Sequence, residues 1–203
     1  MRFLTPALVC CCILTSGYAQ HRIIKNDFSV NENSGTTDQF APQIIKLSNG
    51  NILAAWIDER NGNSDIFGQL DDHSMNPIGT NFRLDDQETS GPIYYSFSIC
   101  PDWNGGFCVA WLQEILYERK RKQIFRARTF DHNRKPLGSS VQINDQGVWC
   151  SGPVTIERLN NNYMVMRRVF RGEDSVWVAA QHLDSVGRKL GKNFTLFPNR
   201  QNN

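Results

Sequence analysis

Four side chains stand out in this sequence because arginine and tryptophan can bind carboxylates or glycans and because these four lie near apolar runs. Arg60 follows one such run, Arg167 and Arg168 end another, and Trp103 precedes an Asn-Gly pair. Arginine binds a carboxylate through two parallel N–H donors, and a tryptophan ring offers an apolar face on which a sugar can stack. These four are the predicted ligand-binding residues. No two carboxyl groups can be assigned as nucleophile and acid, so no catalytic residue is predicted.

Two polar segments offer other chemistry. Asp58–Asp65 is rich in the oxygen-bearing side chains that Ca²⁺ prefers, but its acidic spacing does not recur later in the chain, which favours a polar loop. Tyr117–Lys122 is the densest basic stretch, with Arg126 and Arg128 beyond it. It could meet an acidic glycan, extracellular nucleic acid or a lipid surface, but only Tyr117 and Phe125 are interleaved with it, so we interpret this stretch as a solvated loop. No metal, cofactor or nucleic-acid partner is expected.

Residues 1–19 have the form of a signal peptide. Arg2 precedes a short apolar stretch, Leu4–Leu14, and Ala19 is a small residue suited to cleavage before Gln20. A lipid anchor on one of the cysteines at 10–12 is the alternative. No apolar run long enough to span a membrane follows, so no transmembrane segment is expected. The predicted location is secreted, extracellular or periplasmic.

Three cysteines follow the predicted signal peptide: Cys100, Cys108 and Cys150. Export permits disulfides, but an odd number leaves at least one thiol unpaired within the chain. Cys100 and Cys108 flank Asn104-Gly105. A two-residue turn there would point the two sulfurs to opposite faces, whereas a three-residue loop, residues 103–105, would set them side by side. We favour the two-residue turn without a bridge.

A repeat occupies most of the sequence. The pattern Asp, four residues, Pro or Lys, Ile or Leu, then Gly recurs at Asp72–Gly79, Asp131–Gly138 and Asp184–Gly191, with spacings of 59 and 53 residues. Upstream of each copy, two apolar runs flank Asn-Gly or Asn-Asn, which indicates a β-hairpin. Each copy therefore predicts four strands: two around this turn, one before the Asp and one after the Gly.

The second strand of each unit carries the architectural information. Ile52–Ile57 and Phe107–Leu112 are apolar on both faces, so these strands must be covered on both sides. The fourth strand alternates, as in Phe82–Leu84, which is typical of a half-exposed outer strand. We predict an all-β fold of tandem four-stranded antiparallel blades, a partial, three-blade β-propeller. The predicted boundaries are a signal peptide at 1–19, an N-terminal segment at 20–37, blades at 38–88, 89–146 and 147–198, and a tail at 199–203.

These units resemble the repeats of secreted bacterial β-propeller proteins. The residues that carry the resemblance best are Pro42, Asn49, Gly50, Trp56, Asp65, Ile66, Gln69, Pro77, Ile78 and Gly79. The second copy fits well, whereas the third has Arg167 in place of the tryptophan. The resemblance covers nearly all of residues 22–197 and implies an exported scaffold of sialidase-like architecture. It implies a fold alone, since the sialidase pattern Ser-x-Asp-x-Gly-x-x-Trp does not occur.

The numbers of predicted outer and inner strands do not match. Residues 28–31 look like a further outer strand, so four outer strands would serve three sets of inner ones. Three blades are also too few to close a ring, and open blade faces invite association. Either two copies form a six-bladed homo-oligomer in which each gives its N-terminal strand to the other, or the chain is a piece of a longer array. We prefer the second solution.

These observations favour an extracellular binding or interaction module, with a glycan or a protein as its ligand, over an enzyme. The alternative is a glycoside hydrolase of the sialidase-like type that oligomerisation completes. A third interpretation is a degenerate fragment with no function of its own.

Overall fold

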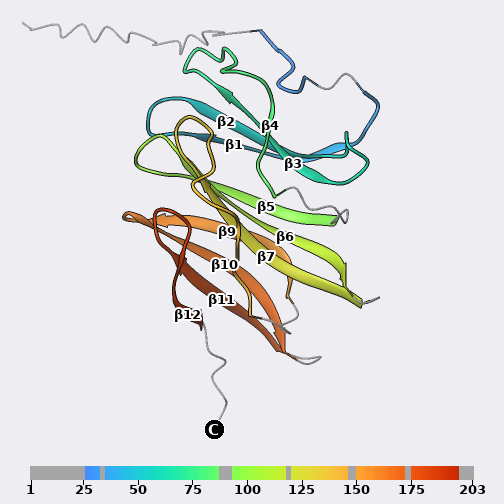
Figure 1. The fold of residues 1–203 in the computed structure, drawn as a ribbon, viewed down its shortest axis with the longest axis vertical. Helices are drawn as coiled ribbons and strands as arrows, with labels where there is room; N and C mark the ends of the chain where they lie inside the picture. The colour runs from blue at the N-terminus through green and yellow to red at the C-terminus, as the bar shows by residue number, and fades with distance from the viewer. Residues whose placement is uncertain are drawn as a thin grey trace, which may run out of the picture.

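The structure is a computed structural model that describes residues 26–32, 35–86, 93–117, 120–145, 150–171 and 175–196. It contains three four-stranded antiparallel sheets, stacked face to face in chain order (Figure 1). This confirms the predicted fold class, three blades of a β-propeller scaffold. The strands are β1 (Gln39–Lys46), β2 (Ile52–Asp58), β3 (Asp65–Asp71) and β4 (Phe82–Arg83) in the first sheet, β5 (Ile93–Pro101), β6 (Phe107–Tyr117), β7 (Lys120–Phe130) and β8 (Val141–Gln142) in the second, and β9 (Cys150–Leu159), β10 (Asn162–Arg171), β11 (Ser175–Leu183) and β12 (Lys189–Thr195) in the third.

Neighbours in each sheet are neighbours in sequence, so β1, β5 and β9 form one edge of the stack and β4, β8 and β12 the other. β5 contacts both β1 and β9, which identifies this edge as the inner one. Within the described part of the chain, no helix is long and apolar enough to cross a membrane.

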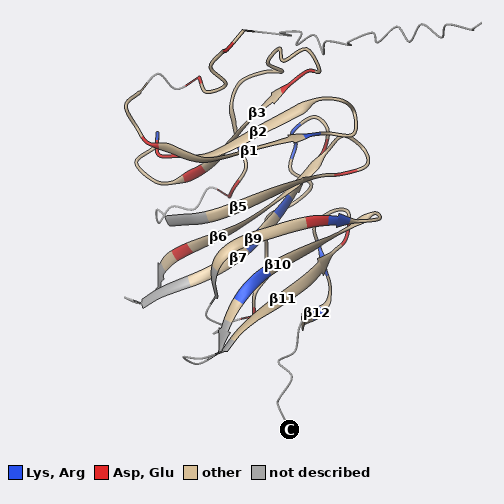
Figure 2. Ribbon diagram, turned by 180° about the vertical axis from the view of Figure 1, so that it is seen from behind, with Lys and Arg blue, Asp and Glu red and all other residues tan. Residues whose placement is uncertain are grey.

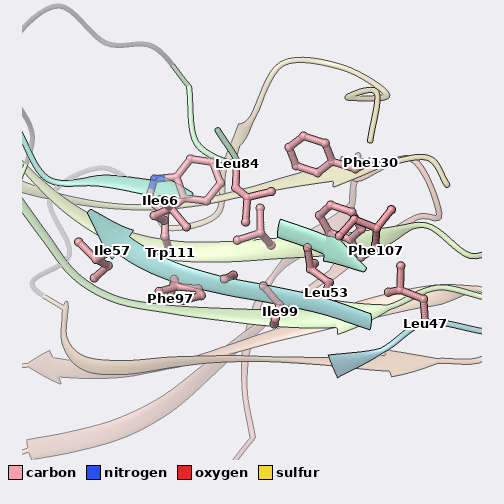
Figure 3. Close-up of a cluster of buried hydrophobic side chains, with 13 residues drawn as sticks. Leu47, Leu53, Ile57, Ile66, Leu84, Phe97, Ile99, Phe107, Trp111 and Phe130 are labelled. Carbon is pink, nitrogen blue, oxygen red and sulfur yellow. The ribbon is translucent and has the colours of Figure 1, made fainter. Parts of the chain in front are cut away.

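The core lies between the sheets because the second strands are apolar on both faces. Figure 3 shows Phe107 and Trp111 of β6 packing with Leu53 and Ile57 of β2 in the cluster between the first two sheets. The intervening residues of β6, such as Leu112, enter a second cluster with the third sheet. The predicted doubly buried strand is thus present in the middle sheet.

Polar side chains join the inner strands of neighbouring sheets. Gln43 of β1 donates through Nε2 to the Phe97 carbonyl at 2.5 Å, and its Oε1 accepts the Ile99 N–H at 3.3 Å. One sheet further on, Ser98 Oγ accepts the Ile156 N–H at 3.3 Å. Each inner strand is therefore fixed to the next through a side chain at one repeated position.

The aspartate that opens each repeat closes the turn between the third and fourth strands. Oδ1 of Asp72, Asp131 and Asp184 accepts the backbone N–H groups two and four residues later, at 2.7–3.0 Å. Three residues after the aspartate the backbone takes a positive φ, at Met75, Arg134 and Gly187. The repeat pattern is thus a turn pattern, since an aspartate side chain readily captures N–H groups just beyond it.

The hairpin turn of the second sheet corrects one prediction. Asp102 N donates to Gly106 O at 3.0 Å, and Gly105 has a φ of +83°, so the loop has three residues and not two. Cys100 consequently stands directly opposite Cys108, and both thiols are buried and free. Burial raises the pKa of Cys100 to about 11 and also raises that of Cys108. The side chain of Cys150 lies outside the described residues.

The N-terminal segment 26–32 forms no strand in the structure. It is joined to the loop before β4 by Asn81, whose Oδ1 accepts the Glu32 N–H at 2.9 Å and whose Nδ2 donates to the Val30 carbonyl at 3.2 Å. The further outer strand expected at 28–31 is therefore seen here as an irregular segment beside the first sheet.

Candidate functional site

The stack has two ends with different chemistry. At the β2–β3 end, β2, β6 and β10 finish and the inner strands β1, β5 and β9 begin. At the opposite, β1–β2 end lie the hairpin turns of the inner strands and the aspartate turns. Figure 2 shows an acidic band on β6 and a basic band on β10 toward the β2–β3 end.

Arg60 lies on the outward face of the first sheet beside a buried carboxylate. Its Nη2 donates to Asp58 Oδ2 at 2.6 Å and to Asn31 Oδ1 at 2.7 Å, and its guanidinium lies 4.1 Å from the centroid of the Phe67 ring. Asp58 also accepts from Trp56 Nε1 at 2.9 Å. Burial acts to raise the pKa of Asp58, but the hydrogen bonds from Arg60 and Trp56 outweigh it, so the pKa is lowered. Arg60 thus balances a charge of the scaffold.

Arg83 holds two further buried carboxylates at this end. Its Nη2 donates to Asp65 Oδ1 and its Nε to Asp85 Oδ1, both at 2.7 Å. The next residue, Asp86, reaches the second sheet, where Arg128 Nη1 lies 3.2 Å from its Oδ1. The oxygen-rich loop considered for Ca²⁺ therefore has Asp58 and Asp65 paired with arginines, and the basic side chain of Arg128 is engaged by a carboxylate.

Two carboxyl groups at the same end are not held by arginine. Asp38 directly precedes β1 and Glu59 directly follows β2, and Glu59 N donates to Asp38 O at 3.1 Å, which sets the two residues opposite each other. Glu59 is half-buried, and its Oε1 accepts from Ser64 Oγ at 3.1 Å. Asp38 is exposed, and its carboxylate makes no hydrogen bond within the described residues. Acid–base chemistry on a glycosidic bond uses two carboxyl groups, and these two residues are placed opposite each other.

The two predicted ligand-binding arginines of β10, Arg167 and Arg168, lie on opposite faces of that strand. Arg167 is 3% exposed, donates through Nη1 to Asn193 Oδ1 at 3.2 Å and lies 5.8 Å from the centroid of the Phe125 ring. It thus packs between the second and third sheets. Arg168 is exposed and lies beside β9, where a side chain at Gly152 would meet its Nε at 3.3 Å.

The four predicted ligand-binding residues are therefore not brought together. Arg60 lies on the first sheet and Arg167 and Arg168 on the third, with the second sheet between them, and Trp103 belongs to a hairpin turn at the β1–β2 end. Sequence reasoning missed Asp38 and Glu59, because their opposition depends on the register of β1 and β2. The feature of the sequence that could have pointed to them is their position: Asp38 stands one residue before β1, and Glu59 stands one residue after β2.

No protein-family model and no curated protein sequence matches the chain. Among solved structures, an endo-arabinase from Bacteroides thetaiotaomicron matches with a TM-score of 0.50 at 16% identity, over 81% of this chain and 64% of the enzyme. An α-L-arabinanase from Penicillium chrysogenum, complexed with arabinobiose, matches with a TM-score of 0.52 at 10% identity, over 81% of this chain and 59% of the enzyme. The chain thus spans less than two thirds of either enzyme. At these identities the likeness shows a shared fold.

These structures correct the functional prediction. An extracellular binding or interaction module was the first interpretation, yet the similar structures are an endo-arabinase and an α-L-arabinanase, both of them enzymes. The finding contradicts that interpretation and supports its alternative, a glycoside hydrolase.

Proposed function

We propose that this chain forms part of a glycoside hydrolase that acts on arabinose-containing glycans. The observation that carries the proposal is the facing pair Asp38 and Glu59, at one end of a scaffold shared with two arabinanases. Because such polysaccharides lie outside cells, the proposal includes an exported protein. Residues 1–19, which lie outside the described part of the chain, are the basis for that location.

The pair suits the two roles that glycoside hydrolysis needs. One carboxylic acid protonates the leaving oxygen while a carboxylate acts as base or nucleophile on the sugar. Glu59, half-buried and with one oxygen bound by Ser64, supplies the proton from its other oxygen, and the exposed Asp38 acts as the carboxylate. Directly opposed residues on paired strands have Cβ atoms about 5 Å apart. Their carboxyl groups can then stand about 5–9 Å apart, a range that includes both retaining and inverting enzymes.

Three blades enclose only part of an axis, and we propose that a second copy of the chain supplies the rest. Thr155 on the outward face of β9 occupies the repeated position at which Gln43 and Ser98 bind the next inner strand. In a second copy, the backbone of Ile44 would meet Thr155 as Ile99 meets Gln43. Two copies would form a six-bladed ring. Light scattering is expected to give the mass of two chains; an active species with the mass of one chain would exclude this arrangement.

The hydrolase proposal is tested with arabinan and arabino-oligosaccharides as substrates. The full chain is expected to release reducing ends, and Asp38→Asn to slow the release by about 10²–10⁴-fold, the usual contribution of a positioned acid or base. Asp27→Asn, the same change at another exposed aspartate, serves as the control and should leave the rate unchanged. The proposal fails if the native chain releases nothing, or if Asp38→Asn matches it.

A further inference from the structure

A cleft of about 310 Å³ opens at the β1–β2 end of the stack, between the second and third sheets. Trp103 and Asn104 line it from the hairpin of the second sheet, and Arg158, Asn161 and Tyr163 from that of the third. It lies at the opposite end of the sheets from Asp38 and Glu59, so it is separate from the proposed catalytic pair.

The Trp103 ring is held in place although it is exposed. It is 56% exposed, yet its Nε1 donates to the Asn160 carbonyl at 2.5 Å. The Arg158 guanidinium lies 3.7 Å from the ring centroid and fixes the ring by a cation–π contact. An aromatic ring fixed before binding loses little conformational entropy when a ligand stacks on it, which favours recognition.

Polar groups with unused hydrogen-bonding capacity line the cleft, and Tyr163 among them is buried. The side-chain amides of Asn104 and Asn161 make no hydrogen bond to any described residue. Burial raises the pKa of Tyr163, so its hydroxyl keeps its proton and remains a donor. An apolar ring beside amide and hydroxyl groups matches the two faces of a sugar: its C–H groups and its hydroxyls.

The charges in the cleft favour a neutral ligand. Arg158 lies over Trp103, and the carboxylate of Asp102 is committed to its own turn, where Oδ1 accepts the N–H groups of Asn104 and Gly106 at 2.7 Å each. One positive and one negative charge balance within the cleft, so an acidic sugar gains no net attraction.

We infer that this cleft is a second glycan-binding site, which holds a neutral oligosaccharide segment against Trp103 away from the catalytic pair. The inference deepens the proposed function and rests on it for the identity of the polymer. A remote site of this kind keeps a long substrate on the enzyme between cleavages.

Calorimetric titration of the full chain with arabinobiose, longer arabino-oligosaccharides, xylo-oligosaccharides and oligogalacturonides tests the inference. A neutral oligosaccharide is expected to bind, and Trp103→Ala to weaken its binding at least about tenfold, as truncation of an aromatic anchor does. Trp103→Phe should recover most of the affinity. Leu190→Ala, a truncation of an exposed apolar side chain outside the cleft, is the control. The inference is overturned if no neutral oligosaccharide binds, or if Trp103→Ala binds as the native chain does.

Two further readouts separate this inference from the proposed function. Trp103→Ala should slow the release of reducing ends from arabinan but not from a short aryl glycoside, which cannot reach both places. If the native chain binds neutral oligosaccharides through Trp103 but hydrolyses none, the site stands and the hydrolase proposal fails. If it hydrolyses arabinan with no effect of Trp103→Ala on binding or rate, the hydrolase stands and the site fails.

Discussion

The two ends of the blade stack use their aspartates differently. At the β1–β2 end, the side chains close turns of their own backbone: Asp102 does so in a hairpin, and Asp131 does so in the turn between the third and fourth strands. At the β2–β3 end, Asp58, Asp65 and Asp85 are held by the side chains of arginines, while Asp38 and Glu59 are held by none.

This difference distinguishes the carboxyl groups that hold the fold together from those that are available for chemistry. An aspartate that accepts two N–H groups of its own turn recurs in every copy of the repeat, because every copy needs that turn. The groups at the β2–β3 end differ from copy to copy, so the repeat does not explain them. This is the end at which the first sheet places Asp38 and Glu59 opposite each other, and where we propose that the chemistry takes place.

The largest effect on stability is expected from the arginine of the β2–β3 end. Arg83→Ala removes the arginine that pairs with the buried carboxylates of Asp65 and Asp85 and should lower the free energy of unfolding by about 3 kcal/mol. Urea denaturation measures the change. Arg188→Ala, which removes an exposed arginine at the other end, should cost less than about 0.5 kcal/mol. Equal losses in the two variants would contradict this account of the β2–β3 end.

A smaller loss is expected at the β1–β2 end. Asp131→Ala removes the acceptor of two backbone N–H groups and should lower the free energy of unfolding by about 1–2 kcal/mol. Asp131→Asn keeps Oδ1 as an acceptor and should recover most of that loss. Because this turn lies at the opposite end of the stack from Asp38 and Glu59, the hydrolysis of a short aryl glycoside by folded Asp131→Ala should match that of the native chain. A folded variant that no longer hydrolyses the short aryl glycoside would contradict the distinction between the ends.

The blades could be predicted from the sequence because their signals are local. The aspartate pattern is a turn that closes within a few residues, and a strand that is apolar on both faces, such as β6, shows this in its own residues. The length of the hairpin loop between β5 and β6 was not predictable in the same way, since Asn104-Gly105 fits both a two-residue and a three-residue loop. The carboxylate of Asp102 accepts the Gly106 N–H, and this hydrogen bond stabilises the three-residue loop.

The candidate site could not be predicted because it depends on strand register. β1 has an irregularity between Phe40 and Gln43, where Ala41 takes a φ of +53°, and this bulge determines which residue of β1 faces which residue of β2. Asp38 meets Glu59 only beyond that bulge. Arg60 and Arg167 were predicted as charged residues beside apolar strands; in the structure Arg60 is paired with Asp58, and Arg167 is buried with one hydrogen bond, to Asn193.

The most direct test of the central claim compares one substitution at the two ends of the stack. Glu59 lies at the β2–β3 end, and Glu157 is an exposed glutamate of β9 near the β1–β2 end. Glu59→Gln is expected to lower kcat/KM for arabino-oligosaccharides by at least about a hundredfold, the lower range for loss of a general acid, while Glu157→Gln leaves it nearly unchanged. Equal activity of the two folded variants would contradict the assignment of chemistry to the β2–β3 end.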